Sequence, residues 1–91
     1  MTVRVQLPPL LRPIMGGQRT VIAEGKSIAA VLEDLATKHP EIGLHIFDES
    51  GGIRRNLVFL HAGAAIRAAE ARDRVVKADD EIVLTNALAG G

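Results

Sequence analysis

The chain has 91 residues, which is enough for one domain and too few for two. Its 11 basic and 11 acidic residues cancel and its only aromatic residues are Phe47 and Phe59, so binding to nucleic acid or to an anionic membrane surface is not expected. The absence of cysteine excludes a disulfide scaffold, a thiolate metal site and a cysteine nucleophile.

The N-terminal segment predicts a β-hairpin. Apolar and polar residues alternate over residues 3–7, which is the period of a half-buried strand. Pro8-Pro9 end this strand, because proline cannot donate a hydrogen bond to a sheet. Residues 10–18 read as a long, partly apolar loop, and residues 19–23 as the second strand of the hairpin. With neither a signal-peptide pattern nor an apolar run of about 20 residues, we expect a soluble cytoplasmic protein.

The clearest helix is predicted to begin after Ser27, whose hydroxyl can accept a hydrogen bond from a free amide of the first turn. The next apolar residues recur at i, i+3, i+4 and i+7 and therefore share one face: Ile28, Val31, Leu32 and Leu35. His39-Pro40 end the helix, since the residue before a proline disfavours helical backbone angles. Residues 41–47 predict a short second helical turn, and residues 48–52 a loop.

Residues 55–61 predict the central strand of the sheet. Leu57 and Phe59 would point to one face of this strand. Val58 and Leu60 would point to the other face, the outer side of the sheet, away from the helix.

The remaining segments complete an α+β fold. Residues 62–63 predict a turn, and residues 64–76 a short strand with an irregular connection. A turn at residues 77–80 leads to a last strand at residues 81–85, which can return to pair beside the first. We therefore expect a β-grasp domain over residues 1–86, in which a mixed sheet of four to five strands packs on one main helix.

The last five residues form a tail in which we expect the chemistry to lie: Ala87, Leu88, Ala89, Gly90 and Gly91. We expect the tail to be flexible and able to thread a narrow channel, because its glycines accept backbone angles closed to other residues. Once activated, for example as an acyl-adenylate, the carboxylate of Gly91 can accept sulfide or acylate an amine. In a chain without cysteine, it is also the only plausible place to carry sulfur covalently. The alternative is a frayed terminus whose glycines have no role.

The strand order and the terminal Gly90-Gly91 together resemble the MoaD/ThiS group of ubiquitin-like sulfur carriers. The resemblance covers nearly the whole chain. Several features look closest to the carriers of cysteine synthesis called CysO, namely Leu11-Arg12-Pro13, Gly16-Gly17, the helix from Ser27, the strand around residues 57–61 and the ending at residues 87–91. Many members have an asparagine in the turn after the central strand, where this chain has Ala62.

The resemblance implies a carrier rather than an enzyme, with no bound cofactor. An E1-like adenylyltransferase would activate the Gly91 carboxylate with ATP and magnesium, and sulfur transfer would then give a thiocarboxylate. A sulfur-accepting synthase would use this sulfur to make cysteine, molybdopterin or a thio-natural product, while residues 87–90 thread the active site of the partner. A metalloprotease that releases the product is a further implied partner.

Val58 and Leu60, together with Arg12, are the residues that we single out as candidates for docking a partner, because exposed apolar patches on small domains often mark interfaces. The alternatives are an ordinary sheet surface, or a surface covered by the loop at residues 10–15. Arg12 and Arg54-Arg55 could also steer the chain to a partner, although scattered surface arginines are more often only solvated.

No metal site or catalytic pair is expected elsewhere. His39, His45 and His61 lack the spacing of a metal motif. Asp79-Asp80-Glu81 are expected to be solvated residues of a turn.

Three other functions remain open. The chain could be a ubiquitin-like modifier joined to lysines through Gly91, or the small subunit of a molybdopterin synthase. It could also be an interaction domain with an inert tail.

Overall fold

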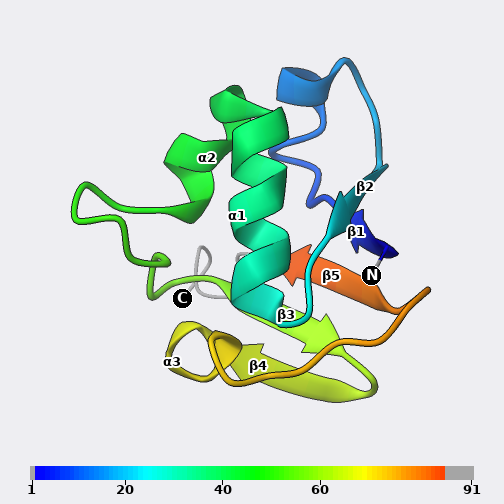
Figure 1. Ribbon diagram of the computed structural model, residues 1–91. Coiled ribbons are helices and arrows are strands. Elements are labelled where there is room, and N and C mark those ends of the chain that lie inside the picture. The colour runs from blue at the N-terminus through cyan, green and yellow to red at the C-terminus, as the bar shows by residue number, and fades with distance from the viewer. Residues whose placement is uncertain (1, 86–91) are drawn as a thin grey trace.

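The structure is a computed structural model that describes residues 2–85 of the chain (Figure 1). The elements follow one another as β1 (Thr2–Gln6), η1 (Pro13–Met15), β2 (Thr20–Glu24), α1 (Ile28–Lys38), α2 (Pro40–Ile46), β3 (Val58–His61), β4 (Ala64–Arg67), α3 (Ala68–Ala71) and β5 (Glu81–Thr85). No helix in this part of the chain is long and apolar enough to cross a membrane.

The five strands of the described chain form one mixed sheet in the order β2-β1-β5-β3-β4. The β1–β2 and β3–β4 hairpins are antiparallel. The last strand, β5, lies between them, parallel to β1 and antiparallel to β3. This is the β-grasp arrangement expected from the sequence, and it makes β5 the central strand of the sheet.

The main helix α1 crosses one face of the sheet, with α2 beside it (Figure 1). Its N-cap is the predicted one, since the Ser27 hydroxyl accepts a hydrogen bond from the Ala30 amide at 3.1 Å. The four apolar residues of the predicted face, Ile28, Val31, Leu32 and Leu35, are all fully buried. They meet an aliphatic core around Phe59, which is also fully buried. The amphipathic pattern of the sequence therefore corresponds to the observed packing.

Two expectations about the C-terminal half need correction. The strand predicted to be central, β3, lies beside the central strand β5. It begins at Val58 rather than at residue 55, because an Ile53–Phe47 bridge and a turn closed by the Leu57 amide on the Arg54 carbonyl precede it. The segment expected to be a short strand and an irregular connection contains β4 and also the helix α3. One helical turn is too short to show a helical period in the sequence.

The loop between β1 and β2 is ordered by its own contacts. It contains η1, whose Met15 is buried, and it turns out of η1 through Gly16 and Gly17 at φ values of 66° and 88°. These left-handed angles favour glycine. Arg12 supports the same loop, because its Nε donates to the Leu7 carbonyl at 3.1 Å.

Candidate functional site

The tail on which the predicted chemistry depends, residues 87–91, lies outside the described residues. The structure does define the point from which it starts, which we call the tail root. The last described residue, Thr85, lies opposite Val58 in the β3–β5 pairing. The Thr85 hydroxyl also donates to the Val58 carbonyl at 2.9 Å. The tail root is therefore held by the central strand of the sheet rather than by a loop.

The predicted docking residues Val58 and Leu60 lie beside the tail root on the face of the sheet opposite α1. In the register of β3, Val58 is flanked by Thr85 and Arg67, and Leu60 by Val83 and Ala65. Directly paired residues point to the same face. We call Val58, Leu60, Ala65, Val83 and Thr85 the outer patch. Leu60 is 44% exposed, and Val58 and Val83 are half-buried. The outer patch thus offers apolar surface next to the start of the tail.

The loop at residues 10–15 does not cover the outer patch. Its Leu10 and Leu11 line a groove of about 300 Å³ with Leu44 of α2, on the helical side of the molecule. The alternative in which this loop shields Val58 and Leu60 is therefore excluded.

Arg12 has a different setting from the other two docking candidates. It belongs to the connection between β1 and β2, is half-buried, and binds the Leu7 carbonyl. The structure thus gives it a role in holding the loop and does not bring it into the strand row of Val58 and Leu60. Its participation in docking stays a prediction.

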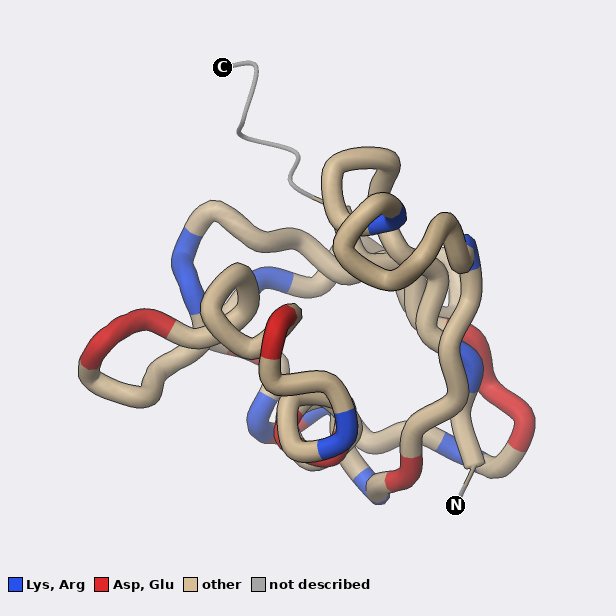
Figure 2. Tube along the Cα trace, turned by 90° about the horizontal axis from the view of Figure 1, so that it is seen from above, with Lys and Arg blue, Asp and Glu red and all other residues tan. Residues whose placement is uncertain are grey.

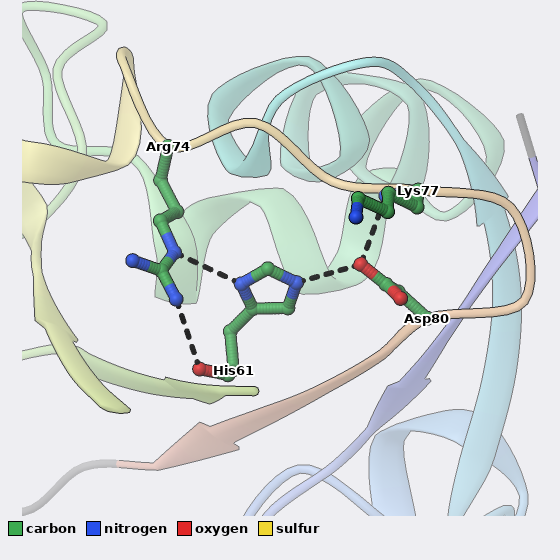
Figure 3. Close-up of polar contacts among 4 residues, drawn as sticks. All are labelled: His61, Arg74, Lys77 and Asp80. Carbon is green, nitrogen blue, oxygen red and sulfur yellow. Dashed lines mark hydrogen bonds and ion pairs between the residues drawn. The ribbon is translucent and has the colours of Figure 1, made fainter. Parts of the chain in front are cut away.

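A buried polar network lies at the end of β3 and β5 that is opposite to the tail root (Figure 3). His61 is only 5% exposed, and its Nε2 lies 2.8 Å from Oδ2 of Asp80. Arg74 donates from Nε to His61 Nδ1 at 3.0 Å and from Nη2 to the His61 carbonyl at 3.3 Å. Because Nδ1 accepts a hydrogen bond, the proton of the neutral ring belongs on Nε2, which donates to Asp80.

This network fastens the segment between α3 and β5 to the end of β3. Two hydrogen bonds lower the pKa of Asp80 from its ordinary value of 3.8. The larger effect comes from His61, and the smaller from the Lys77 amide, which donates to Asp80 at 2.8 Å. Asp80 is therefore not the merely solvated turn residue that the sequence suggested. His61 and Asp80 are 19 residues apart, so only the register of β3 against β5 reveals the pair. No group of three metal-ligating side chains occurs within residues 2–85.

The mixed five-stranded sheet packed on α1 places the chain in the class of ubiquitin-like β-grasp proteins. A solved structure of a BexX/CysO complex from Amycolatopsis orientalis contains a chain with a TM-score of 0.80 and 26% identity, covering 98% of this chain and 99% of that one. The small archaeal modifier protein 1 (SAMP1) from Methanosarcina acetivorans has a TM-score of 0.79 and 28% identity, covering 99% of this chain and 96% of that one.

Sequence comparison identifies the particular family. The chain is 30% identical over 93 residues to the sulfur carrier protein CysO of Mycobacterium bovis, and the match covers both proteins completely. The ThiS family matches it over residues 5–91. The chain therefore belongs to the ThiS family of ubiquitin-like sulfur carriers, as the resemblance of its sequence indicated. Its role in this family is that of a carrier rather than a catalyst.

Proposed function

We propose that this chain carries sulfur as a thiocarboxylate on Gly91. An E1-like enzyme uses ATP and magnesium to convert the Gly91 carboxylate into an acyl-adenylate, and releases pyrophosphate. A sulfide equivalent then displaces AMP and leaves a C–S bond at the terminal carbon. A synthase takes the sulfur for a small acceptor, and we place cysteine synthesis first because the full-length relative is a CysO protein. Molybdopterin and thio-natural products are the other acceptor pathways.

The observation that carries this proposal is the extent of the family match, which includes the terminal Gly90-Gly91 as well as the folded domain. The position of the tail root supports it further. Because Thr85 lies on the central strand and pairs with Val58 within the outer patch, a partner that binds Val58 and Leu60 would hold the start of the tail at a defined place. Residues 87–90 would then reach into its active site.

Two kinds of partner follow from this chemistry, an activating enzyme and a sulfur-accepting synthase. That the CysO chain of Amycolatopsis orientalis was solved in a complex with BexX supports a protein partner for this chain as well. A metalloprotease would be needed only if the product stays attached to Gly91.

Intact-protein mass spectrometry of the chain from its native host, with mapping of the C-terminal peptide, tests the proposal. The expected result is a mass shift equal to the replacement of one oxygen by sulfur, confined to the peptide that contains Gly91. Because hydrolysis can remove the sulfur, an unmodified chain is next incubated with ATP, magnesium, a sulfur source and the E1-like enzyme. Failure to form the thiocarboxylate under these conditions would exclude the proposed function.

A second candidate function is protein modification, which the similarity to SAMP1 favours. In this case Gly91 is joined to lysine side chains of other proteins through isopeptide bonds. Peptide mapping of host proteins for lysines that carry the C-terminal residues of this chain distinguishes the two functions. Such adducts, absent when Gly91 is deleted, would assign modification.

A further inference from the structure

The tail root shares its end of the sheet with the helix α3. Both β4 and β5 run antiparallel to β3, so they finish at the same end. Thr85, Val58 and Arg67 form one row across three neighbouring strands, which puts the Arg67 and Thr85 backbones about 10 Å apart at about 4.8 Å per strand. Because α3 follows β4 directly, it also lies near the start of the tail.

A recess with two arginines opens at this end. It has a volume of about 360 Å³ and an apolar lining of Ile53, Ala68 and Ala69, and we call it the arginine recess. Its charged residues are Arg55, Arg72 and Asp73, all of them exposed. Two arginines and one aspartate therefore line this apolar recess.

The arginines of the recess differ from three other arginines of the chain, which hold the fold together. Arg12, Arg54 and Arg74 bind the Leu7 carbonyl, the Leu44 carbonyl and His61 respectively. Within residues 2–85, the guanidinium groups of Arg55 and Arg72 make neither a hydrogen bond nor an ion pair. Their charges are therefore available to a partner.

The surrounding charge is also uneven. The adjacent arginines before β3, in blue, and the acidic turn before β5, in red, lie on opposite sides of the molecule, and the loop after α2 adds a second red stretch on the side of the arginines (Figure 2). The excess of positive charge is confined to the recess itself, whose lining has Arg55 and Arg72 against the single carboxylate of Asp73.

We propose that the arginine recess binds an acidic surface of the activating enzyme, at the mouth of its ATP site. This inference rests on the proposed function. The tail brings a carboxylate towards a site that holds the phosphates of ATP, and these like charges repel one another. Positive charge beside the tail root offsets this repulsion. It also orients the carrier so that its tail points towards the activating enzyme as the two proteins associate. This repulsion favours the activating enzyme over a synthase as the partner, because only the activating step brings the anionic terminus to a nucleoside triphosphate.

The test compares two double variants that remove the same charge. Arg55→Gln with Arg72→Gln neutralises the arginine recess. Lys26→Gln with Lys77→Gln neutralises two exposed lysines at the end of the sheet that holds the His61 network. These two lysines lie close together, because the Val76 amide donates to the Lys26 carbonyl. The association rate constant is measured against the E1-like enzyme that loads wild-type Gly91 in the mass-spectrometric assay, at low and at high salt. Thermal unfolding verifies that both variants fold.

We expect the recess variant to associate about tenfold more slowly at low salt, and the difference to shrink to about twofold at high salt. The lysine variant should associate at nearly the wild-type rate, and Arg55→Lys with Arg72→Lys should restore most of the rate because the charge is kept. Equal effects of the two neutralising variants, or no effect of either, would overturn the inference. Loading of wild-type Gly91 by the same enzyme tests the proposed function independently. The proposed function can therefore hold even if the arginine recess has no part in binding.

Discussion

At the end of the sheet where β5 begins, His61, Asp80 and Arg74 bind one another, whereas at the end where β5 finishes the guanidinium groups of Arg55 and Arg72 have no partner within residues 2–85. The first end uses polar side chains to hold a long connection in place. The second leaves arginines and the apolar outer patch exposed beside the tail root. If partners bind at the tail root as we propose, stability and partner binding belong to opposite ends of the same strands, and substitutions should separate the two properties.

Deletion of Gly91 should have the largest effect on sulfur loading and the smallest effect on stability. We expect sulfur loading to disappear, because the tail then ends at a different carbon, while the free energy of unfolding stays within about 0.5 kcal/mol of the wild type. Addition of one alanine after Gly91 should have the same result. Mass spectrometry after incubation with the activating enzyme and urea denaturation measure the two properties. Loading of the extended chain would contradict the terminal role of Gly91.

His61→Ala should have the opposite outcome. The substitution removes a buried side chain and leaves Asp80 and Arg74 without their shared partner, so we expect a loss of about 2–3 kcal/mol in the free energy of unfolding. Loading of Gly91 should persist at temperatures where the variant is folded. Urea denaturation gives the first quantity and mass spectrometry the second. A stable variant that is no longer loaded would show that the two ends are not separate.

Leu60→Asp tests the outer patch. A charge in the middle of an apolar docking surface should weaken binding to the activating enzyme by about tenfold or more. The matched control is Ile22→Asp, since Ile22 is 49% exposed, close to the 44% of Leu60, but lies on the edge strand β2. Calorimetric titration measures both affinities. Equal weakening by the two substitutions would remove the outer patch from the docking surface.

Asp80 makes the stability contributed by the His61 network sensitive to acid. Its pKa is lower in the folded chain than the ordinary value of 3.8, so its stabilising effect is complete above that value. The effect is lost as the pH falls through the lowered pKa, because the unfolded chain then binds the proton more readily. Urea midpoints measured between about pH 5 and pH 2 should fall less steeply for Asp80→Asn than for the wild type. Asp73→Asn, which removes a carboxylate outside the His61 network, is the control.

The smallest effect is expected at the turn between β3 and β4. Ala62 has a left-handed φ of 51° and is followed by Gly63 at 81°. Most L residues, alanine included, are strained in this conformation. Asparagine tolerates it better and commonly precedes glycine in the favoured two-residue hairpin turn. Ala62→Asn should raise the free energy of unfolding by about 0.5–1 kcal/mol. A melting temperature equal to or below that of the wild type would contradict this expectation.

Much of the fold could be predicted because its periodic segments are strong. The alternation in β1 and the i, i+3, i+4, i+7 face of α1 depend only on neighbours along the chain. The short segments could not be predicted equally well. Neither β4 nor α3 has more than four residues, so neither shows a period that would separate strand from helix.

The site was predictable only in part for the same reason. Alternation over the longer segment at residues 55–61, which includes β3, was sufficient to find Val58 and Leu60. Their neighbours Val83 and Thr85 depend on the pairing of β3 with β5, which no local pattern encodes. The contact of His61 with Asp80 depends on the same pairing. The arginine recess brings together the segment before β3 and the helix after β4, so it too appears only once the chain is folded.

The central place of β5 has a consequence for how the protein is made. A chain synthesised only as far as residue 80 contains both hairpins, but the strand that joins them in the described sheet is missing. The pairing of β1 with β5 also joins the two most distant parts of the described chain, and such contacts form late in folding. The complete outer patch can thus arise only after translation has passed Thr85. A partner that recognises this surface therefore selects chains synthesised at least to the start of the tail, and incomplete products of the ribosome cannot compete for it.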